Sequence, residues 1–308
     1  MFEFLKKILT TTNPHLIKMK IVIILAILLL STLSYRFIYP KNKEGFKQGE
    51  PFILKRNNNA QDMFYIELYD KLNNINKIAN EDLIHIIKTT SPSAKHSVFL
   101  DAGCGTGEIV NELTEAGYSA YGIDNCENMV SYSKMKYPNL EVLNGDILQP
   151  MMFEKNTFTH ILCTYFTIYN INNKQQFINN CYHWLQPGGY LVLHLVDKYN
   201  FKNIIPNEDA VISNENLHNK FILRNKVIFT DYEYKGSIEL LKNSNNATKI
   251  ETFTDINTHN VRQNETDIYM EDITDILNMV KNTGFIYHAK TIISNDTKQY
   301  LYYFEKTM

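Results

Sequence analysis

The chain has little arginine and little clustered positive charge. Only four of its 308 residues are arginine, and the formal net charge is −2. That charge is unevenly spread, since residues 1–50 carry about +5 and the remainder about −7. An acidic body is a poor match for nucleic acid, because binding phosphates requires clustered Lys and Arg. We therefore expect no nucleic-acid partner.

Cysteine and metal-ligand patterns are also sparse. The four cysteines (Cys104, Cys126, Cys163 and Cys181) are scattered, and none forms a CxxC pair. This usage predicts free thiols in a reducing compartment and no disulfide scaffold. The nine histidines show no HxH or HxxxH spacing, so we expect no metal site. The GK[ST] signature of a phosphate-binding P-loop and internal repeats are absent too.

A long apolar run is confined to the N-terminal region. Ile21 to Tyr35 holds no charge, and the run continues through Tyr39 if Arg36 reaches toward the interface. The 19 residues 21–39 span about 28 Å as a helix, close to the bilayer core. We predict a basic tail at 1–20 and a single-pass membrane helix at 21–39. The free thiols favour a cytosolic C-terminal body, while a cleaved signal peptide and a buried core helix stay open.

The rest of the chain divides into a polar linker and one large domain. Residues 40–61 contain Pro and Gly and predict a tether, and residues 62–308 predict the folded body, which begins with helices from residue 62 and over 81–88. Strands and helices then alternate. Strands are expected at 97–101, 119–123, 140–144, 158–165 and 190–196, and helices at 107–116, 127–136 and 175–185, with a Pro-Gly-Gly turn at 187–189. This alternation predicts a doubly wound α/β sheet of mostly parallel strands.

The alternation of strands and helices ends after the fifth strand. Residues 199–267 lack helical periodicity, and 226–234 and 249–257 predict antiparallel strands. A helix at 271–281, capped by Gly284, and a hairpin of 286–293 with 299–305 close the chain. We therefore expect a strand-rich insertion followed by a C-terminal antiparallel hairpin.

The most informative motif is the segment VFLDAGCGTGEIV, Val98 to Val110. A strand ends at Asp101, and Gly103, Gly105 and Gly107 lie in the turn that leads into a helix. Glycines allow a tight bend and close approach of a ligand to the backbone, and the helix N-terminus favours an anion. Asp101 can bind an ammonium group and the helix N-terminus can bind a carboxylate, so together they suit an amino acid moiety. The spacing is not that of the dinucleotide fingerprint, since Glu108 stands at its third glycine.

Two further acids end neighbouring strands. Asp124 follows the second strand, where a carboxylate can accept both hydroxyls of a ribose. Asn144-Gly145-Asp146-Ile147 follows the third strand. A carboxylate beside an apolar residue can bind an exocyclic amine and cover a purine face.

Together these motifs resemble class I S-adenosylmethionine-dependent methyltransferases. The matching stretches are FLDAGCGTG, YGIDNCENMV, LNGDI, FTHILCTYFTIYNI and LQPGGYLVLHLVD, between Phe64 and Asp197. The resemblance implies a Rossmann-like sheet of seven strands, the last antiparallel, with S-adenosylmethionine as cofactor. It implies that cofactor-binding residues are Asp101, Ala102, Gly103, Cys104, Gly105, Gly107, Asp124, Asn125, Met129, Gly145, Asp146, Ile147, Cys163, Thr164 and Tyr165.

The sequence says less about the acceptor of the methyl group than about the cofactor. The fourth strand ends in Cys-Thr-Tyr-Phe and lacks the N/D-P-P-Y motif of enzymes that methylate nucleobase or amide nitrogens. The insertion at 199–267 resembles the lid of small-molecule amine methyltransferases. Candidate substrate contacts are Tyr65, Tyr69, Tyr169 and Arg262, and candidate catalytic residues are Tyr165 and His194. Core packing for the tyrosines, a structural role for His194 and a salt bridge for Arg262 are the competing interpretations.

Three functions compete. The first is methylation of a small-molecule nucleophile, favouring an amine. The second is methylation of a lipid or quinone at the membrane, motivated by the apolar N-terminal segment. The third is a non-catalytic module that keeps the fold for binding. The oligomeric state does not follow from the sequence.

Overall fold

The computed structural model describes residues 18, 21–22, 24–25, 28–30, 48–199, 211–217, 220–294 and 298–307. The chain forms two units, residues 1–47 and 48–308. The described residues of the first unit are helical. Within the described residues, no helix is long and apolar enough to cross a membrane. The membrane helix predicted at 21–39 lies largely outside the described residues.

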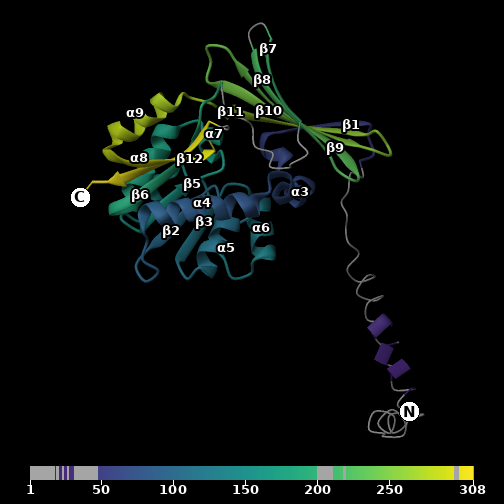
Figure 1. Cartoon of the computed structure of the whole chain (residues 1–308), viewed down its shortest axis with the longest axis horizontal. Helices are drawn as coiled ribbons and strands as arrows, with labels where there is room; N and C mark the ends of the chain where they lie inside the picture. Colours follow the sequence, from purple (N-terminus) through teal and green to yellow (C-terminus); the bar gives the residue numbers. More distant parts are fainter. Residues whose placement is uncertain are drawn as a thin grey trace. The chain divides into compact units, whose positions relative to one another are not determined.

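The second unit contains two sheets in its described part (Figure 1). The core sheet has seven strands in the order β12-β13-β6-β5-β2-β3-β4. Their bounds are Val98–Ala102 (β2), Ser119–Asp124 (β3), Glu141–Asn144 (β4), Phe158–Cys163 (β5), Leu185–Val196 (β6), Phe285–Ser294 (β12) and Gln299–Lys306 (β13). Strands β2 to β6 pair in parallel, whereas β13 is antiparallel to both β6 and β12. The predicted seven-stranded sheet with its antiparallel hairpin is confirmed.

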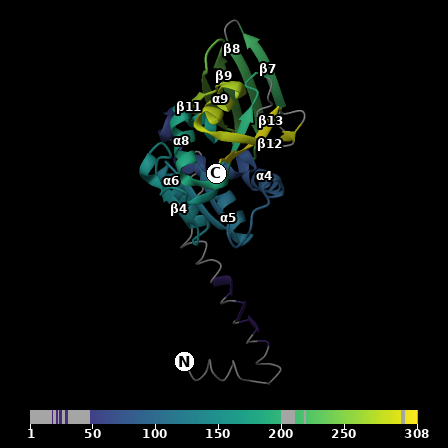
Figure 2. The ribbon, with the colours of Figure 1, turned by 90° about the vertical axis from the view of Figure 1, so that its left-hand side faces the viewer.

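Helices cover both faces of this sheet (Figures 1 and 2). They are Met63–Asn73 (α3), Ile75–Thr90 (α4), Glu108–Glu115 (α5), Glu127–Lys136 (α6), Thr167–Asn170 (α7), Lys174–Trp184 (α8) and Ile273–Thr283 (α9), with a short 3-10 helix at Pro150–Met152 (η2). Apolar residues of α4 and α5 pack with Phe99 and Leu162, whereas those of α8 and α9 pack with Leu100 and Cys163. Because side chains alternate along a strand, each strand contributes to both cores.

The second sheet lies over the carboxyl ends of the parallel core strands, and we call it the lid sheet. Its order is β1-β11-β10-β9-β8-β7. The strands are Phe52–Arg56 (β1), Val211–Leu217 (β7), Lys220–Ile228 (β8), Tyr232–Leu241 (β9), Asn246–Asp255 (β10) and Val261–Tyr269 (β11). The predicted strand-rich insertion is present, and β1 and the 3-10 helix Asn57–Ala60 (η1) arise from the segment predicted as a linker.

Two local predictions are wrong. The strand expected at 226–234 is interrupted, because the chain turns after Ile228 and the Phe229 N–H donates to the Tyr232 carbonyl at 2.9 Å. The Pro-Gly-Gly segment expected as a turn lies inside β6, where the pairing with β5 is irregular and Gly188 has φ +77°. This irregular pairing accommodates the bend at the two glycines within the strand, so β6 already starts at Leu185.

Candidate functional site

The glycine turn joins β2 to α5 at the carboxyl edge of the core sheet. The backbone N–H groups of Gly103 and Cys104 donate to the Ile123 carbonyl, at 2.8 and 3.1 Å, and this fastens the turn to β3. Gly103 has φ +80°, and a Cβ there would collide with the Thr167 side chain. Gly105 has φ +51°, and an added Cβ would meet only Tyr69, at 3.9 Å. The turn is therefore packed tightly on one side and open above Gly105.

Asp124 closes the turn from the neighbouring strand. Its Oδ2 accepts the Gly105 N–H at 2.9 Å, and its Oδ1 accepts the Cys126 N–H at 2.8 Å. Burial raises the pKa of Asp124, and these two backbone donors oppose the rise. Burial, followed by repulsion from Asp124, raises the pKa of Asp101 to about 7. Two carboxyls thus lie at the turn with little to neutralise them, which favours a cationic ligand.

A cavity of about 470 Å³ opens above this edge. Its floor holds Gly103, Gly105, Asp124, Asn125, Met129, Gly145, Asp146 and Ile147. Its walls hold Tyr65, Tyr69, Tyr165 and Tyr169, and its roof holds Tyr234, Lys249 and Glu251 of the lid sheet. This volume is in the usual range for a small-molecule site. Glycines, two acids and an apolar pair at adjacent strand ends fit a nucleoside with an amino acid arm.

Other predicted site residues lie outside this cavity. Asp101, Cys104 and Thr164 line a smaller adjoining cavity, whereas Cys163 is buried in the core and Ala102 is buried in β2. Gly107 caps α5 with φ +83°, and a Cβ there would press on Leu140 and Ser133. Its role is thus in packing.

His194 and Arg262 do not line this cavity either. His194 is 1% exposed, its Nε2 bonds to Gln299 Oε1 at 3.0 Å, and burial lowers its pKa to about 4. Arg262 is buried, pairs with Asp62 at 2.9 Å and lies over the Phe64 ring. Since Asp62 is the N-cap of α3, Arg262 fastens the lid strand β11 to that helix.

Sequence reasoning missed the group at the roof of the cavity. Glu251 is 2% exposed, and its Oε1 accepts from Tyr65 and Tyr234, both at 3.0 Å. Lys249 Nζ lies 3.0 Å from the same oxygen and 3.2 Å from the Tyr65 hydroxyl. Burial and then Glu251 raise the pKa of Tyr65 well above its ordinary value, so the phenol stays protonated. The one available signal was a charged residue on the inward face of a strand, between Lys249 and Phe253.

A second network holds the exit of the glycine turn. Thr106 Oγ1 donates to Asp70 at 2.6 Å, and Lys136 Nζ bridges Asp70 at 2.7 Å and Glu108 at 2.8 Å. These contacts join α3, α5 and α6 around the turn. No sequence motif indicated them, because each partner comes from a different element.

Backbone strain marks the wall nearest the lid. Tyr165 and Phe166 follow β5 with φ +45° and +66°, a region that residues with side chains rarely adopt. The Tyr165 hydroxyl donates to Asn73 Oδ1 at 2.7 Å, which holds the ring against α3. Strained residues of this kind gather at ligand sites.

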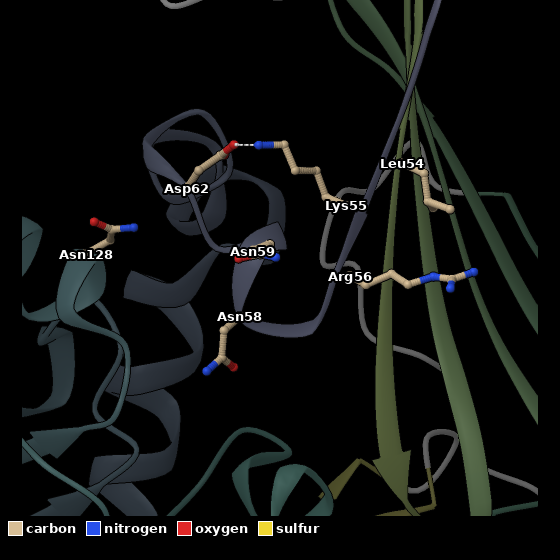
Figure 3. Close-up of a pocket in the computed structure, with 7 residues that line it drawn as sticks. All are labelled: Leu54, Lys55, Arg56, Asn58, Asn59, Asp62 and Asn128. Atoms are coloured by element: carbon tan, nitrogen blue, oxygen red, sulfur yellow. Dashed lines mark ion pairs between the residues drawn. The ribbon is translucent and has the colours of Figure 1, made fainter.

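A different hollow lies outside this arrangement (Figure 3). It measures about 540 Å³ and is lined by Leu54, Lys55, Arg56, Asn58, Asn59, Asp62 and Asn128. Its cations already have partners, since Lys55 pairs with Asp62 at 3.2 Å and Arg56 with Glu265 at 3.0 Å. We therefore place the candidate site at the smaller but better-built cavity above the glycine turn.

Part of the chain resembles known proteins. Residues 100–193 match the family model described as a methyltransferase domain. A demethylmenaquinone methyltransferase from Chlorobaculum tepidum is 27% identical over 119 residues, which cover 35% of this chain and 48% of that protein. The chain thus spans about half the length of this curated relative.

Solved structures agree at the level of the fold. A S-adenosylmethionine-dependent methyltransferase from Clostridium acetobutylicum has a TM-score of 0.55 at 16% identity, covering 79% of this chain and 98% of its own. The S-adenosylmethionine-bound amino pentose methyltransferase CalS10 from Micromonospora echinaspora has a TM-score of 0.54 at 14% identity, covering 80% and 97%. Residues 100–193 thus resemble a methyltransferase domain, and the second unit has the fold of S-adenosylmethionine-dependent methyltransferases of known structure.

Proposed function

We propose that this protein transfers a methyl group from S-adenosylmethionine to an amine of a small molecule. The observation that carries the proposal is the buried Glu251 carboxylate, which forms part of the roof of the cavity whose floor is the predicted cofactor site. The amino pentose activity named for CalS10, a neighbour in fold, supports the same acceptor chemistry.

The Glu251 carboxylate in the roof is paired with Lys249 through one oxygen and keeps further acceptor capacity. Glu251 has a second oxygen, and an ionised carboxylate offers about four acceptor positions, so a ligand ammonium can bind beside the present donors. The rings of Tyr65, Tyr69, Tyr165 and Tyr234 also line the cavity. Aromatic faces attract cations, and a carboxylate with several rings favours an ammonium over a neutral alcohol.

The protein contributes to the reaction by positioning the cofactor and the acceptor. When bound, S-adenosylmethionine supplies a methyl group on a positively charged sulfur. Asp124 and the glycine turn fix the nucleoside from the core sheet, and Glu251 fixes the acceptor from the lid. Holding both reactants in one cavity converts an encounter of two molecules into a single-complex step, which is worth several kcal/mol of the barrier. The lid also limits water in the cavity.

A lipid or quinone acceptor at the membrane is the second candidate. It is favoured by the name of the Chlorobaculum relative, a demethylmenaquinone methyltransferase, and by the predicted helix at 21–39. The Glu251 carboxylate and the four tyrosine rings that line the cavity favour the amine instead, since a quinone ring offers no cation for them. The membrane helix and a cytosolic body stay predictions.

The test is a methyl-transfer screen with labelled S-adenosylmethionine against a panel of amino sugars, amino acids and polyamines, with demethylmenaquinone in vesicles as the other arm. Glu251→Gln should raise KM for the amine at least tenfold, because the amide keeps the shape and loses the charge. Glu233→Gln is the matched control, since Glu233 lies on neighbouring β9, pairs with Lys226 of β8 and with Lys235, and does not line the cavity.

Each outcome has a clear meaning. Transfer to demethylmenaquinone and to no amine would replace the amine proposal with the quinone. Cofactor binding without transfer to any acceptor would favour a non-catalytic module. An unchanged KM in Glu251→Gln would remove Glu251 from substrate binding.

A further inference from the structure

The cavity above the glycine turn contains little positive charge. Among the described residues that line it, Lys249 is the one basic side chain, whereas Asp124, Asp146, Glu251 and Asp267 are acidic. Lys249 belongs to the lid sheet, which faces the acceptor, and not to the core strand ends where the nucleoside is predicted. This single cation therefore carries information about the acceptor that the acids do not.

Lys249 and Glu251 stand next to each other on the inner face of β10, because residues two apart on a strand point to the same side. Lys249 Nζ lies 3.0 Å from Glu251 Oε1 and 3.2 Å from the Tyr65 hydroxyl. Within the lid sheet, Lys249 pairs with Ile238 of β9 and Thr266 of β11, and both of these residues line the cavity too. The roof thus presents a cation and an anion side by side.

The two charged groups differ in accessibility. The side chain of Lys249 is 31% exposed, and that of Glu251 is 3% exposed. An ammonium group has three N–H donors, and Glu251 and the Tyr65 hydroxyl account for two of those of Lys249 in the described structure. The third donor is available to a ligand, and a carboxylate is the acceptor with which an ammonium forms its stronger hydrogen bonds.

A ligand with a single charge matches this pair poorly. An amine without an acid group would be attracted by Glu251 and repelled by Lys249, and an acid without an amine would meet the reverse arrangement. A molecule with both charges close together satisfies both side chains. An α-amino acid is such a molecule, because its ammonium and its carboxylate are attached to one carbon atom.

We propose that the acceptor is an α-amino acid, that Lys249 binds its carboxylate, and that Glu251 and the tyrosine rings hold its amine. The inference rests on the proposed function and narrows the acceptor of that reaction. The nitrogen loses one proton to water and attacks the methyl carbon as the carbon–sulfur bond breaks. The products are the N-methyl amino acid and S-adenosylhomocysteine. Lys249 thereby acts as a specificity residue that no sequence motif indicates.

Matched acceptors test this on the unmodified full-length protein. Methyl transfer from labelled S-adenosylmethionine is measured with the common amino acids, each compared with its amide and with the amine that lacks the carboxyl group. The acid should have a kcat/KM at least tenfold above both partners, because they keep the amine and lose the anion. An amide or a simple amine that reacts as well as the acid overturns the inference and leaves the proposed function intact. If no amine reacts, the proposed function fails and the inference falls with it.

Substitution of Lys249 tests the assigned contact. Lys249→Gln should raise KM for the best amino acid at least tenfold and change kcat less than threefold, because the lost contact is the same before and during transfer. Lys249→Arg should recover most of the loss, since it keeps the charge. Lys235→Gln is the matched control, because Lys235 lies on β9, pairs with Glu233 and does not line the cavity. An unchanged KM in Lys249→Gln contradicts the proposal.

Calorimetric titration with S-adenosylhomocysteine shows which carboxylate Lys249 binds. Lys249→Gln should bind this nucleoside within twofold of the wild type, and that result also shows that the variant is folded. Binding that is tenfold weaker would assign Lys249 to the carboxylate of the cofactor and would overturn its assignment to the acceptor.

Discussion

Asp124 offers the sharpest test of the cofactor site, because it has two separable tasks. Its oxygens accept the N–H groups of Gly105 and Cys126, at 2.9 and 2.8 Å, and its carboxylate also faces the cavity where a ribose is predicted. Replacing it by alanine removes both tasks. Replacing it by asparagine keeps the shape and one acceptor oxygen, and removes the charge.

The expected magnitudes follow from these contacts. A hydrogen bond to a charged group contributes about 1.5–3 kcal/mol, so Asp124→Asn should weaken S-adenosylhomocysteine by about 10- to 100-fold. Asp124→Ala also leaves two backbone donors without their acceptor, and we expect it to lower the free energy of unfolding by about 2 kcal/mol. Calorimetric titration gives the affinity, and urea unfolding gives the stability.

A control is available on the lid sheet. Asp255 Oδ1 accepts the N–H groups of Asn257 and Thr258, at 2.8 and 2.7 Å, in the turn that follows β10. Asp255→Asn makes the same chemical change without touching the cavity, so its affinity should equal that of the wild type. Binding of S-adenosylhomocysteine to Asp124→Asn within twofold of the wild type would refute the ribose assignment.

Three more expectations concern the turn, the lid and pH. Gly105→Val should abolish nucleoside binding measured by titration, because the side chain enters the open space above a backbone with φ +51°; retained affinity would place the ligand elsewhere. Arg262→Met should lower the free energy of unfolding by about 1–2 kcal/mol, because it removes the ion pair with Asp62, which keeps Lys55 as a partner, while nucleoside affinity persists; a selective loss of affinity would indicate that Arg262 contributes to the site. The pKa of Asp82 is raised to about 7 in the folded state, so between about pH 4 and 7 the folded wild type binds more protons than its unfolded chain and becomes less stable as pH rises. Asp82→Asn removes this loss, and its stability relative to the wild type should therefore increase across the same window. Urea unfolding at several pH values checks this, and a gain that does not grow with pH contradicts it.

The core sheet could be predicted from sequence because its information is local. Short apolar strands followed by helices with glycine ends, such as Gly117 and Gly284, specify α/β units within a few tens of residues, and both glycines have positive φ. The strand-end acids Asp124 and Asp146 could be placed at the cavity for the same reason, since parallel strands bring their carboxyl ends to one edge.

The lid and its chemistry depend on distant pairings that local patterns do not encode. The break at 229–231 lies in a stretch rich in β-branched and aromatic residues that looks like one strand. Arg262 was a substrate candidate as one of few arginines, and its salt-bridge partner, Asp62, could not be identified because it is 200 residues away. Glu251 could not be assigned to the site, because a charged residue at an alternating strand position is recognised as inward-facing only when the opposite surface is known.

Strand β1, at the start of the second unit, pairs with β11, which is about 200 residues later in the chain. Phe52 pairs in parallel with Val261, and Arg56 with Glu265, across about two thirds of the chain. Such a pairing closes a very long loop, which slows its formation relative to the neighbouring helices and strands. On the ribosome, the β1 segment must wait unpaired until β11 has been synthesised. Maturation of the lid edge is therefore tied to the end of translation, and a prematurely terminated chain leaves this edge open to pairing with other chains.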